Sequence, residues 1–190
     1  MVEELKNHGF SDNVVPWTRG VDREIFKPAE RKAKEKLVLL NVGRVSKEKN
    51  LEKFYEIDIP NCQKIQVGDG PMLGKYIKRY PDVNFVGSKR GVELAHYYQQ
   101  ADVFVFPSCW DTFGLVMIEA MACGTPVAAY PVQGPIDVID NDITGVMDAN
   151  LSTAIKKALD LDRENVYNKS TNWSWERAWE IFRDNLRNSK

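Results

Sequence analysis

Short apolar runs that alternate with helical patterns constrain the fold of this chain more than any other feature. The runs are rich in β-branched and aromatic residues, are bounded by turn residues, and span residues 14–17, 37–42, 64–67, 83–86, 103–106 and 127–129. Near-continuous apolarity of this kind is typical of strands that are buried on both faces of a parallel sheet.

Helical patterns lie between most of these runs and after the last of them, at residues 50–57, 72–80, 92–100, 115–123, 151–161 and 174–187. The alternation predicts an α/β fold: a Rossmann-like, doubly wound parallel sheet of about six strands with helices on both faces. A chain of 190 residues suits one such domain. We divide it into an opening segment and linker (1–36), a core (37–161) and a C-terminal helix (174–187).

Composition narrows the possible functions. Lys plus Arg (26) nearly balances Asp plus Glu (27), so no overall field attracts nucleic acid. The two histidines, His8 and His96, have no partners at metal-ligand spacing, and no metal site is predicted. Cys62, Cys109 and Cys123 are interpreted as reduced core thiols of a cytoplasmic protein.

Ligands of doubly wound domains bind beyond the carboxyl ends of the strands, so the loops there are candidate sites. The loop after residues 37–42 begins with Gly43 and carries Arg44 and Lys49. A guanidinium grips phosphate oxygens with two hydrogen bonds, and an ammonium acts as a mobile point charge. These cations therefore indicate phosphate binding, with an ordinary solvated loop as the alternative.

Glycines follow the next two runs. Gly68 and Gly70, before Pro71, permit close approach of a ligand to the backbone, although a plain strand-to-helix turn explains them equally well. Val86 and Gly87 leave room for a flat group to hydrogen-bond to bare backbone. Each signal is weak when taken alone.

Residues 111–127 (DTFGLVMIEAMACGTPV) carry the strongest functional signal. A helix that begins near Phe113–Leu115 leaves the amides of Gly114, Leu115 and Val116 without intrahelical partners. Together with the helix dipole these amides form an anion site, and Gly114 removes the side chain that would block approach.

Two carboxylates flank that predicted anion site. Glu119 lies about one turn into the helix, and helical side chains tilt toward the N-terminus, so its carboxylate can reach back. Carboxylates repel phosphate but accept hydrogen bonds from hydroxyls, which predicts sugar or ribose contacts for Glu119 and Asp111. The alternative is that Asp111 or Thr112 caps the helix and that Glu119 is a paired helix acid.

The ordered set of loops resembles the C-terminal half of retaining glycosyltransferase family 4 enzymes of the GT-B fold, over nearly the whole chain. The matching pieces are Gly20-Val21-Asp22 with Phe26 and Pro28, Gly43-Arg44 with Lys49, Gly68-Asp69-Gly70-Pro71, Phe85-Val86-Gly87, and residues 111–127. The resemblance implies one half of a GT-B fold and a donor that is a UDP- or GDP-linked hexose. It implies no metal and no other cofactor.

Roles for the site residues follow from the same resemblance. Arg44 and Lys49 would neutralise the diphosphate of the donor and stabilise the departing nucleoside diphosphate. Asp111 would contact the transferred sugar and Glu119 the ribose. The backbone near Val86 would hold the nucleobase, and the residues that begin the helix would offer amides. Asp111 departs from the family pattern, which more often has Glu there.

A second departure concerns the acceptor site, which in this family lies mainly on an N-terminal domain that we expect to be absent from this chain. The resemblance therefore implies a donor-binding domain that turns over poorly alone. Open alternatives are a subunit of a split enzyme that pairs with an acceptor domain on another chain, a non-catalytic nucleotide-binding or interaction module, and a related epimerase or phosphorylase. Membrane association of a complete enzyme stays open.

The C-terminal helix is rich in aromatic residues. In the family this helix packs back toward the N-terminal domain, and we expect at least two of its rings to cap the chain's own core. The residues are Trp173, Trp175, Trp179 and Phe182.

Overall fold

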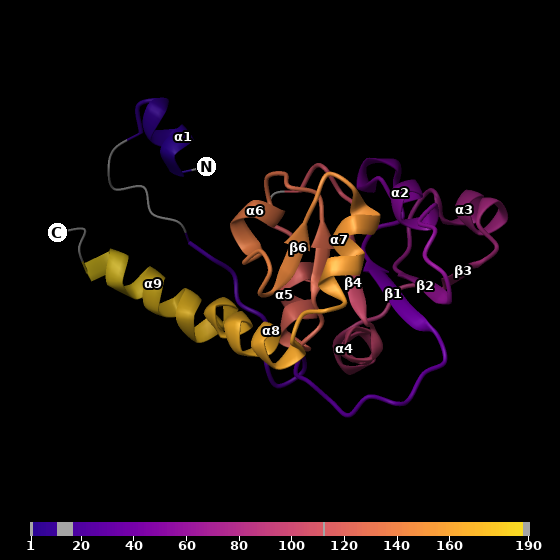
Figure 1. Cartoon of the computed structure of the whole chain (residues 1–190). Coiled ribbons are helices and arrows are strands. Elements are labelled where there is room, and N and C mark those ends of the chain that lie inside the picture. The colour runs from indigo at the N-terminus through magenta and orange to yellow at the C-terminus, as the bar shows by residue number, and fades with distance from the viewer. Residues whose placement is uncertain (1, 11–16, 112, 188–190) are drawn as a thin grey trace.

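The computed structural model describes residues 2–10, 17–111 and 113–187. Its centre is one sheet of six strands in the order β3-β2-β1-β4-β5-β6 (Figure 1). The strands are β1 (Leu37–Val42), β2 (Cys62–Val67), β3 (Val83–Phe85), β4 (Val103–Phe106), β5 (Val127–Ala129) and β6 (Gly145–Met147). All neighbouring pairs are parallel. The order reverses between β1 and β4, as in doubly wound nucleotide-binding folds, which confirms the predicted fold class.

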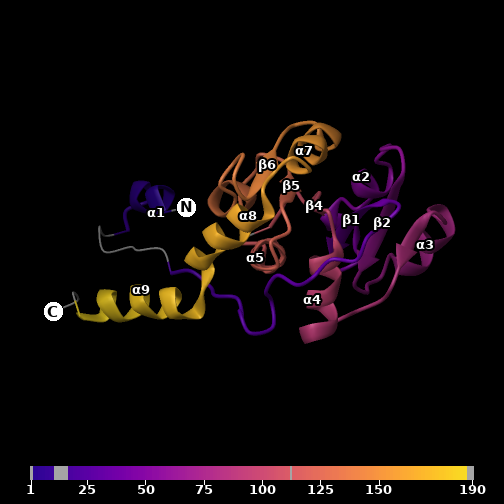
Figure 2. The same cartoon turned by 60° about the horizontal axis from the view of Figure 1, so that its bottom comes forward.

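Helices cover both faces of the sheet (Figures 1 and 2). One face packs against α4 (Gly91–Gln100), α5 (Leu115–Ala122) and α8 (Arg163–Lys169), and the other against α2 (Glu52–Tyr55), α3 (Leu73–Arg79) and α7 (Leu151–Ala158). The remaining helical elements are α1 (Val2–Asn7), η1 (Lys47–Lys49), α6 (Pro135–Val138), η2 (Ser170–Trp173) and α9 (Trp175–Arg187).

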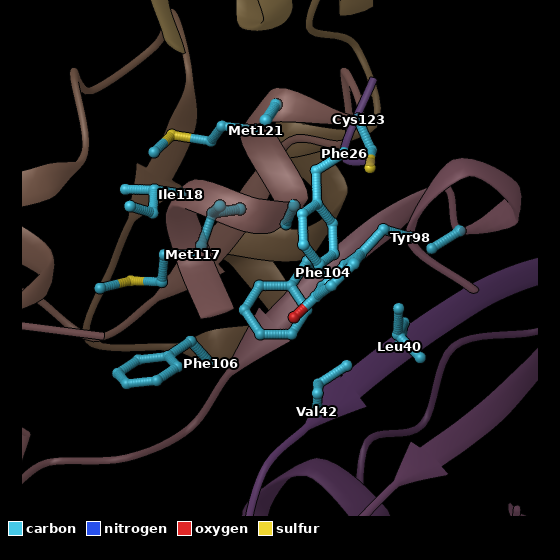
Figure 3. Close-up of a cluster of buried hydrophobic side chains, with 14 of the residues drawn as sticks. Phe26, Leu40, Val42, Tyr98, Phe104, Phe106, Met117, Ile118, Met121 and Cys123 are labelled. Carbon is cyan, nitrogen blue, oxygen red and sulfur yellow. The ribbon is translucent and has the colours of Figure 1, made fainter. Parts of the chain in front are cut away.

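Two hydrophobic cores lie on the two sides of the sheet. Because successive side chains of a strand point to opposite faces, Leu40 of β1 faces α4 and α5 while Leu39 faces the α2 side. In the first core, Phe104 packs with Met117 and Tyr98 (Figure 3). β1, β4 and β5 are largely apolar on both faces because both faces are covered, which is the reason their sequences read as near-continuous runs, whereas β2 and β3 carry polar residues.

The structure differs from the predicted elements in several places. Residues 14–16 of the first predicted strand lie outside the described residues, and Trp17 is in no strand. The sixth strand is instead β6, which has only three residues and no longer apolar run to signal it. Helices α1, α6 and α8 were not predicted, and the helix expected over 151–161 ends at Ala158. In α8 only Val166 is buried, so the sequence carries no clear periodicity.

The opening segment is fixed against the start of α9. Val21 N–H donates to the carbonyl of Trp173 (2.9 Å), and a Cβ on Gly20 would lie 2.3 Å from the Trp175 nitrogen. Helix α9 then extends away from the sheet (Figure 1). Its Trp179 and Phe182 are 58% and 38% exposed.

Of the four aromatic residues considered above, Trp173 packs against the core and the other three lie on the surface of α9. The expectation that at least two of these rings cap the core is therefore wrong. The thiols also differ from expectation, because Cys123 is buried but Cys109 is exposed. In the described part of the chain, no helix combines the length and apolarity needed to cross a bilayer.

Candidate functional site

The candidate site is a crevice at the carboxyl ends of β1 and β4, where the strand order reverses. The chain leaves β1 toward α2 on one face and leaves β4 toward α5 on the other, so the two loops diverge. Between them lies a cavity of about 310 Å³, within the range of small-ligand sites. Its described lining comprises Arg19, Asn41, Val42, Gly43, Arg44, Lys49, Leu51, Phe106, Pro107, Ser108, Asp111, Phe113, Gly114, Leu115 and Val116.

The charges in this lining favour an anion. Arg19, Arg44 and Lys49 are cationic, and Asp111 is the one carboxylate among the described lining residues. Arg44 is exposed, and its guanidinium forms no hydrogen bond to other described residues. A free guanidinium at the mouth of a cavity can grip a phosphate with two parallel hydrogen bonds.

Lys49 and Asp111 form an ion pair across the cavity. Lys49 Nζ lies 2.8 Å from Asp111 Oδ2, and the two side chains are 28% and 18% exposed. The predicted phosphate cation and the predicted sugar carboxylate therefore neutralise each other, a contact that the sequence did not indicate.

Asp111 also fixes the turn that precedes α5. Its Oδ1 accepts hydrogen bonds from the amides of Phe113 (3.3 Å) and Gly114 (3.1 Å), an Asx-type turn that leads into Gly114, the N-cap residue of α5. The alternative that Asp111 caps the helix is therefore wrong, and Thr112 lies outside the described residues. The amide of Gly114, expected to be open to an anion, is already bonded. The amides of Leu115 and Val116 form no hydrogen bond to other described residues.

Gly68 and Gly70 do not line the cavity but support the loop that carries Arg44. A Cβ on Gly68 would lie 1.9 Å from the carbonyl oxygen of Gly43, and one on Gly70 would lie 2.4 Å from that of Val45. Val45 N–H donates to the carbonyl of Asp69 (2.9 Å) across the same contact. The two glycines therefore allow loop-to-loop packing, where the sequence suggested close approach of a ligand.

Val86 and Gly87 lie farther along the same edge of the sheet, and neither lines the cavity. Val86 N–H donates to the carbonyl of Gln66 (3.1 Å), and the carbonyl of Gly87 accepts from Gly68 N–H (2.9 Å). Gly87 has φ +73°, and no atom lies within 4 Å of the position that a Cβ would take. The space beside it is open.

Glu119 lies on α5 outside the lining of the cavity. Its Oε2 accepts a hydrogen bond from the hydroxyl of Tyr98 on α4 (2.9 Å). Burial raises the pKa of Glu119 above its usual value, and the Tyr98 hydrogen bond acts against this rise.

Three polar lining residues were missed. Arg19 directly precedes Gly20-Val21-Asp22, and a cation beside a turn motif was its only signal. Asn41 is 3% exposed and donates to the carbonyl of Val105 (2.8 Å); the signal was a polar residue inside an apolar run. Ser108, also buried, follows β4. Among the described residues no group of three His, Cys, Asp or Glu side chains is placed to hold a metal ion.

The doubly wound sheet with a basic crevice at its switch point defines a Rossmann-like domain. The chain belongs to the glycosyl transferases group 1 family, whose model matches residues 22–173. The resemblance to glycosyltransferases of the GT-B fold is thus confirmed.

Known proteins similar to this chain are longer than it. A GDP-mannose-dependent alpha-mannosyltransferase of Corynebacterium glutamicum is 34% identical over 77% of this chain and 38% of its own length. The sulfoquinovosyl transferase SQD2 of Arabidopsis thaliana is 38% identical over 68% of this chain and 28% of its own length. The lipopolysaccharide outer core galactosyltransferase WaaB superimposes with a TM-score of 0.80 at 17% identity, covering 99% of this chain and 59% of that structure. The chain therefore spans under two fifths of these two sequence relatives.

Proposed function

We propose that this chain is the donor-binding domain of a retaining, metal-independent glycosyltransferase that transfers a hexose from a UDP- or GDP-linked sugar. The observation that carries the proposal is the cavity between β1 and β4, whose lining holds Arg44 and the Lys49–Asp111 ion pair beside the start of α5. The named activities of the sequence relatives, a mannosyl and a sulfoquinovosyl transfer, support a nucleotide-sugar donor.

In this proposal the diphosphate lies against Arg44, Lys49 and the start of α5. Charge-assisted hydrogen bonds and the helix dipole neutralise it and stabilise the charge that develops as the nucleoside diphosphate departs. Because the Gly114 amide is taken by Asp111, the amides of Leu115 and Val116 carry the backbone contribution.

In this proposal, donor binding changes the partners of Lys49 and Asp111. A diphosphate competes for Lys49 Nζ, which weakens the ion pair and frees Asp111 Oδ2 to accept a hydrogen bond from a sugar hydroxyl. Glu119 takes the ribose in the same way, and the open space beside Gly87 takes the base.

A calorimetric panel tests the proposal. Titration of UDP, GDP, their hexose derivatives, the monophosphates and the nucleosides should show saturable binding in which a diphosphate binds at least ~10-fold more tightly than its monophosphate. EDTA should leave the affinity unchanged. Absence of saturable binding for every nucleotide would overturn the proposal, and an EDTA-sensitive affinity would remove its metal-independent part.

Asp111→Asn separates the turn-forming hydrogen bonds of this residue from its charge. Asparagine forms the same side-chain-to-backbone turn as aspartate, so we expect nearly unchanged stability. Lys49 loses its competing carboxylate, so a free nucleoside diphosphate should bind as tightly or more tightly. The extra affinity for the sugar derivative should fall by ~10-fold, because an amide is a weaker acceptor than a carboxylate. An unchanged ratio between the two ligands, measured by calorimetry, would exclude a sugar contact for Asp111.

Transfer by this chain is a separate proposal, since it spans only part of the length of its relatives. A glycosyltransferase subunit that needs an acceptor domain on another chain is the second candidate. Donor turnover should be assayed with and without a separately expressed N-terminal domain of a relative. Turnover only in the mixture indicates a split enzyme, and binding without turnover indicates an interaction module.

A further inference from the structure

Tyr98 is a fully buried tyrosine whose hydroxyl forms a hydrogen bond to a residue of the proposed donor site. It lies on α4, and its hydroxyl donates to Glu119 Oε2 on α5 at 2.9 Å. Figure 3 shows its ring inside the core, with the hydroxyl oxygen on the side nearer Val42 and Phe106. Both of these residues line the cavity, so the hydroxyl points toward the ligand end of the sheet.

The tyrosine is rigidly held. Its ring makes edge contacts with Phe26 and Phe104, at centroid distances of 6.0 and 5.6 Å, and its carbonyl accepts a hydrogen bond from Thr125 Oγ1 (2.6 Å). Burial raises the pKa of Tyr98 well above its usual value, so the hydroxyl stays protonated and remains a donor.

The contact leaves the two oxygens of Glu119 unequal. Oε2 is bonded to Tyr98, whereas Oε1 has no hydrogen-bond partner among the described residues. Oε1 is also not one of the described side-chain atoms that are both fully buried and unpaired, so it is not completely enclosed by the protein. One oxygen is anchored and the other remains available as an acceptor.

We propose that Tyr98 is a positioning residue that holds the Glu119 carboxylate with Oε1 presented to a ribose hydroxyl of the donor. The inference rests on the proposed function. Without the tyrosine hydroxyl, the half-buried carboxylate loses its anchor and turns among its rotamers, so its hydrogen bond to the ribose weakens. Tyr98 thus sets how strongly the site distinguishes ribonucleotides from deoxynucleotides without touching the nucleotide.

The test compares Tyr98→Phe with Tyr55→Phe. Tyr55 is a matched control because it is buried in the other core and its hydroxyl donates to Gln66 Oε1 (3.1 Å). Calorimetry uses UDP or GDP, whichever binds more tightly, with its 2′-deoxy and 3′-deoxy forms. The wild type should prefer the ribose form over one deoxy form by ~10-fold or more. Tyr98→Phe should reduce that ratio at least about threefold, and Tyr55→Phe should leave it unchanged.

A double-mutant cycle excludes a merely structural role. In a Glu119→Gln background, Tyr98→Phe should not narrow the ratio further, because the carboxylate that it positions is absent. An unchanged ratio in Tyr98→Phe, an equal loss in Tyr55→Phe, or additive losses in the cycle would each overturn the inference. If the wild type binds the ribose nucleotide and its two deoxy forms equally, this inference is wrong while the proposed function stands. A wild type that binds no nucleotide overturns both.

Discussion

Gly68→Ala is expected to destabilise the domain by ~4 kcal/mol or more, a large share of the stability of a typical domain. A methyl group at Gly68 would lie 1.9 Å from the carbonyl oxygen of Gly43, and φ at this residue is +133°, where side chains are strained. Neither the β1 loop nor the β2 loop can retreat freely, because Gly43 N–H is bonded to the carbonyl of Val67 at 3.0 Å. The midpoint of urea unfolding, followed by circular dichroism, measures the loss.

Gly74→Ala is the matched control for this substitution. Gly74 is exposed in α3, and no atom lies within 4 Å of the position that its Cβ would take. The same chemical change should therefore stabilise the chain by up to ~1 kcal/mol, because alanine favours helix. If Gly68→Ala unfolds at the same urea concentration as the wild type, the packing of the β2 loop on the β1 loop is not tight in solution.

The sheet was largely predictable because its strands are covered on both faces. Residues 37–42 and 103–106 read as strands from apolarity alone, and both are nearly fully buried. The failure at β6 is due to its length, because three residues carry too short a pattern to indicate a strand. The strand order was expected only as a class, since spacing along the chain does not determine which strands pair.

The candidate site was predictable as loops but not as contacts. Gly43, Arg44 and Asp111 were found because carboxyl ends of parallel strands converge, and the structure brings them to one cavity. The Lys49–Asp111 pair joins residues far apart in sequence, so no local pattern announces it. Gly68 was assigned to ligand approach because a sequence does not show whether a glycine faces a ligand or another loop.

Glu119 shows a similar limit. Its position in the helix fixed the side from which it projects, but the sequence did not place the Tyr98 hydroxyl beside it. Arg19 lines the cavity. The neighbouring Gly20 packs on the start of α9, and this long-range contact helps to place Arg19. In each case the residue type was visible in the sequence, and the partner depended on tertiary structure.

Arg44→Ala should produce the largest loss of ligand binding. The guanidinium lines the cavity, is exposed, and has no hydrogen-bond partner among the described residues, so its removal leaves no buried charge unpaired. Its contribution is therefore that of charge-assisted hydrogen bonds to the diphosphate, about 1.5–3 kcal/mol, or roughly 10- to 150-fold in Kd. Folding stability should not change, because surface substitutions of this kind usually alter it by less than ~0.5 kcal/mol.

Lys47→Ala is the control that separates a bound contact from a general field. Lys47 lies on the same loop, is exposed and does not line the cavity. Lys47→Ala therefore removes one positive charge, as Arg44→Ala does, but removes no direct contact to the ligand. Calorimetry with the nucleoside diphosphate should show a small, salt-sensitive loss for Lys47→Ala and a loss for Arg44→Ala that survives at high salt, since screening weakens distant charges more than direct contacts. Arg44→Lys should fall between Arg44→Ala and the wild type, because a lysine keeps the charge but not the two parallel hydrogen bonds. Equal losses for Arg44→Ala and Lys47→Ala would mean that the diphosphate does not bind at Arg44.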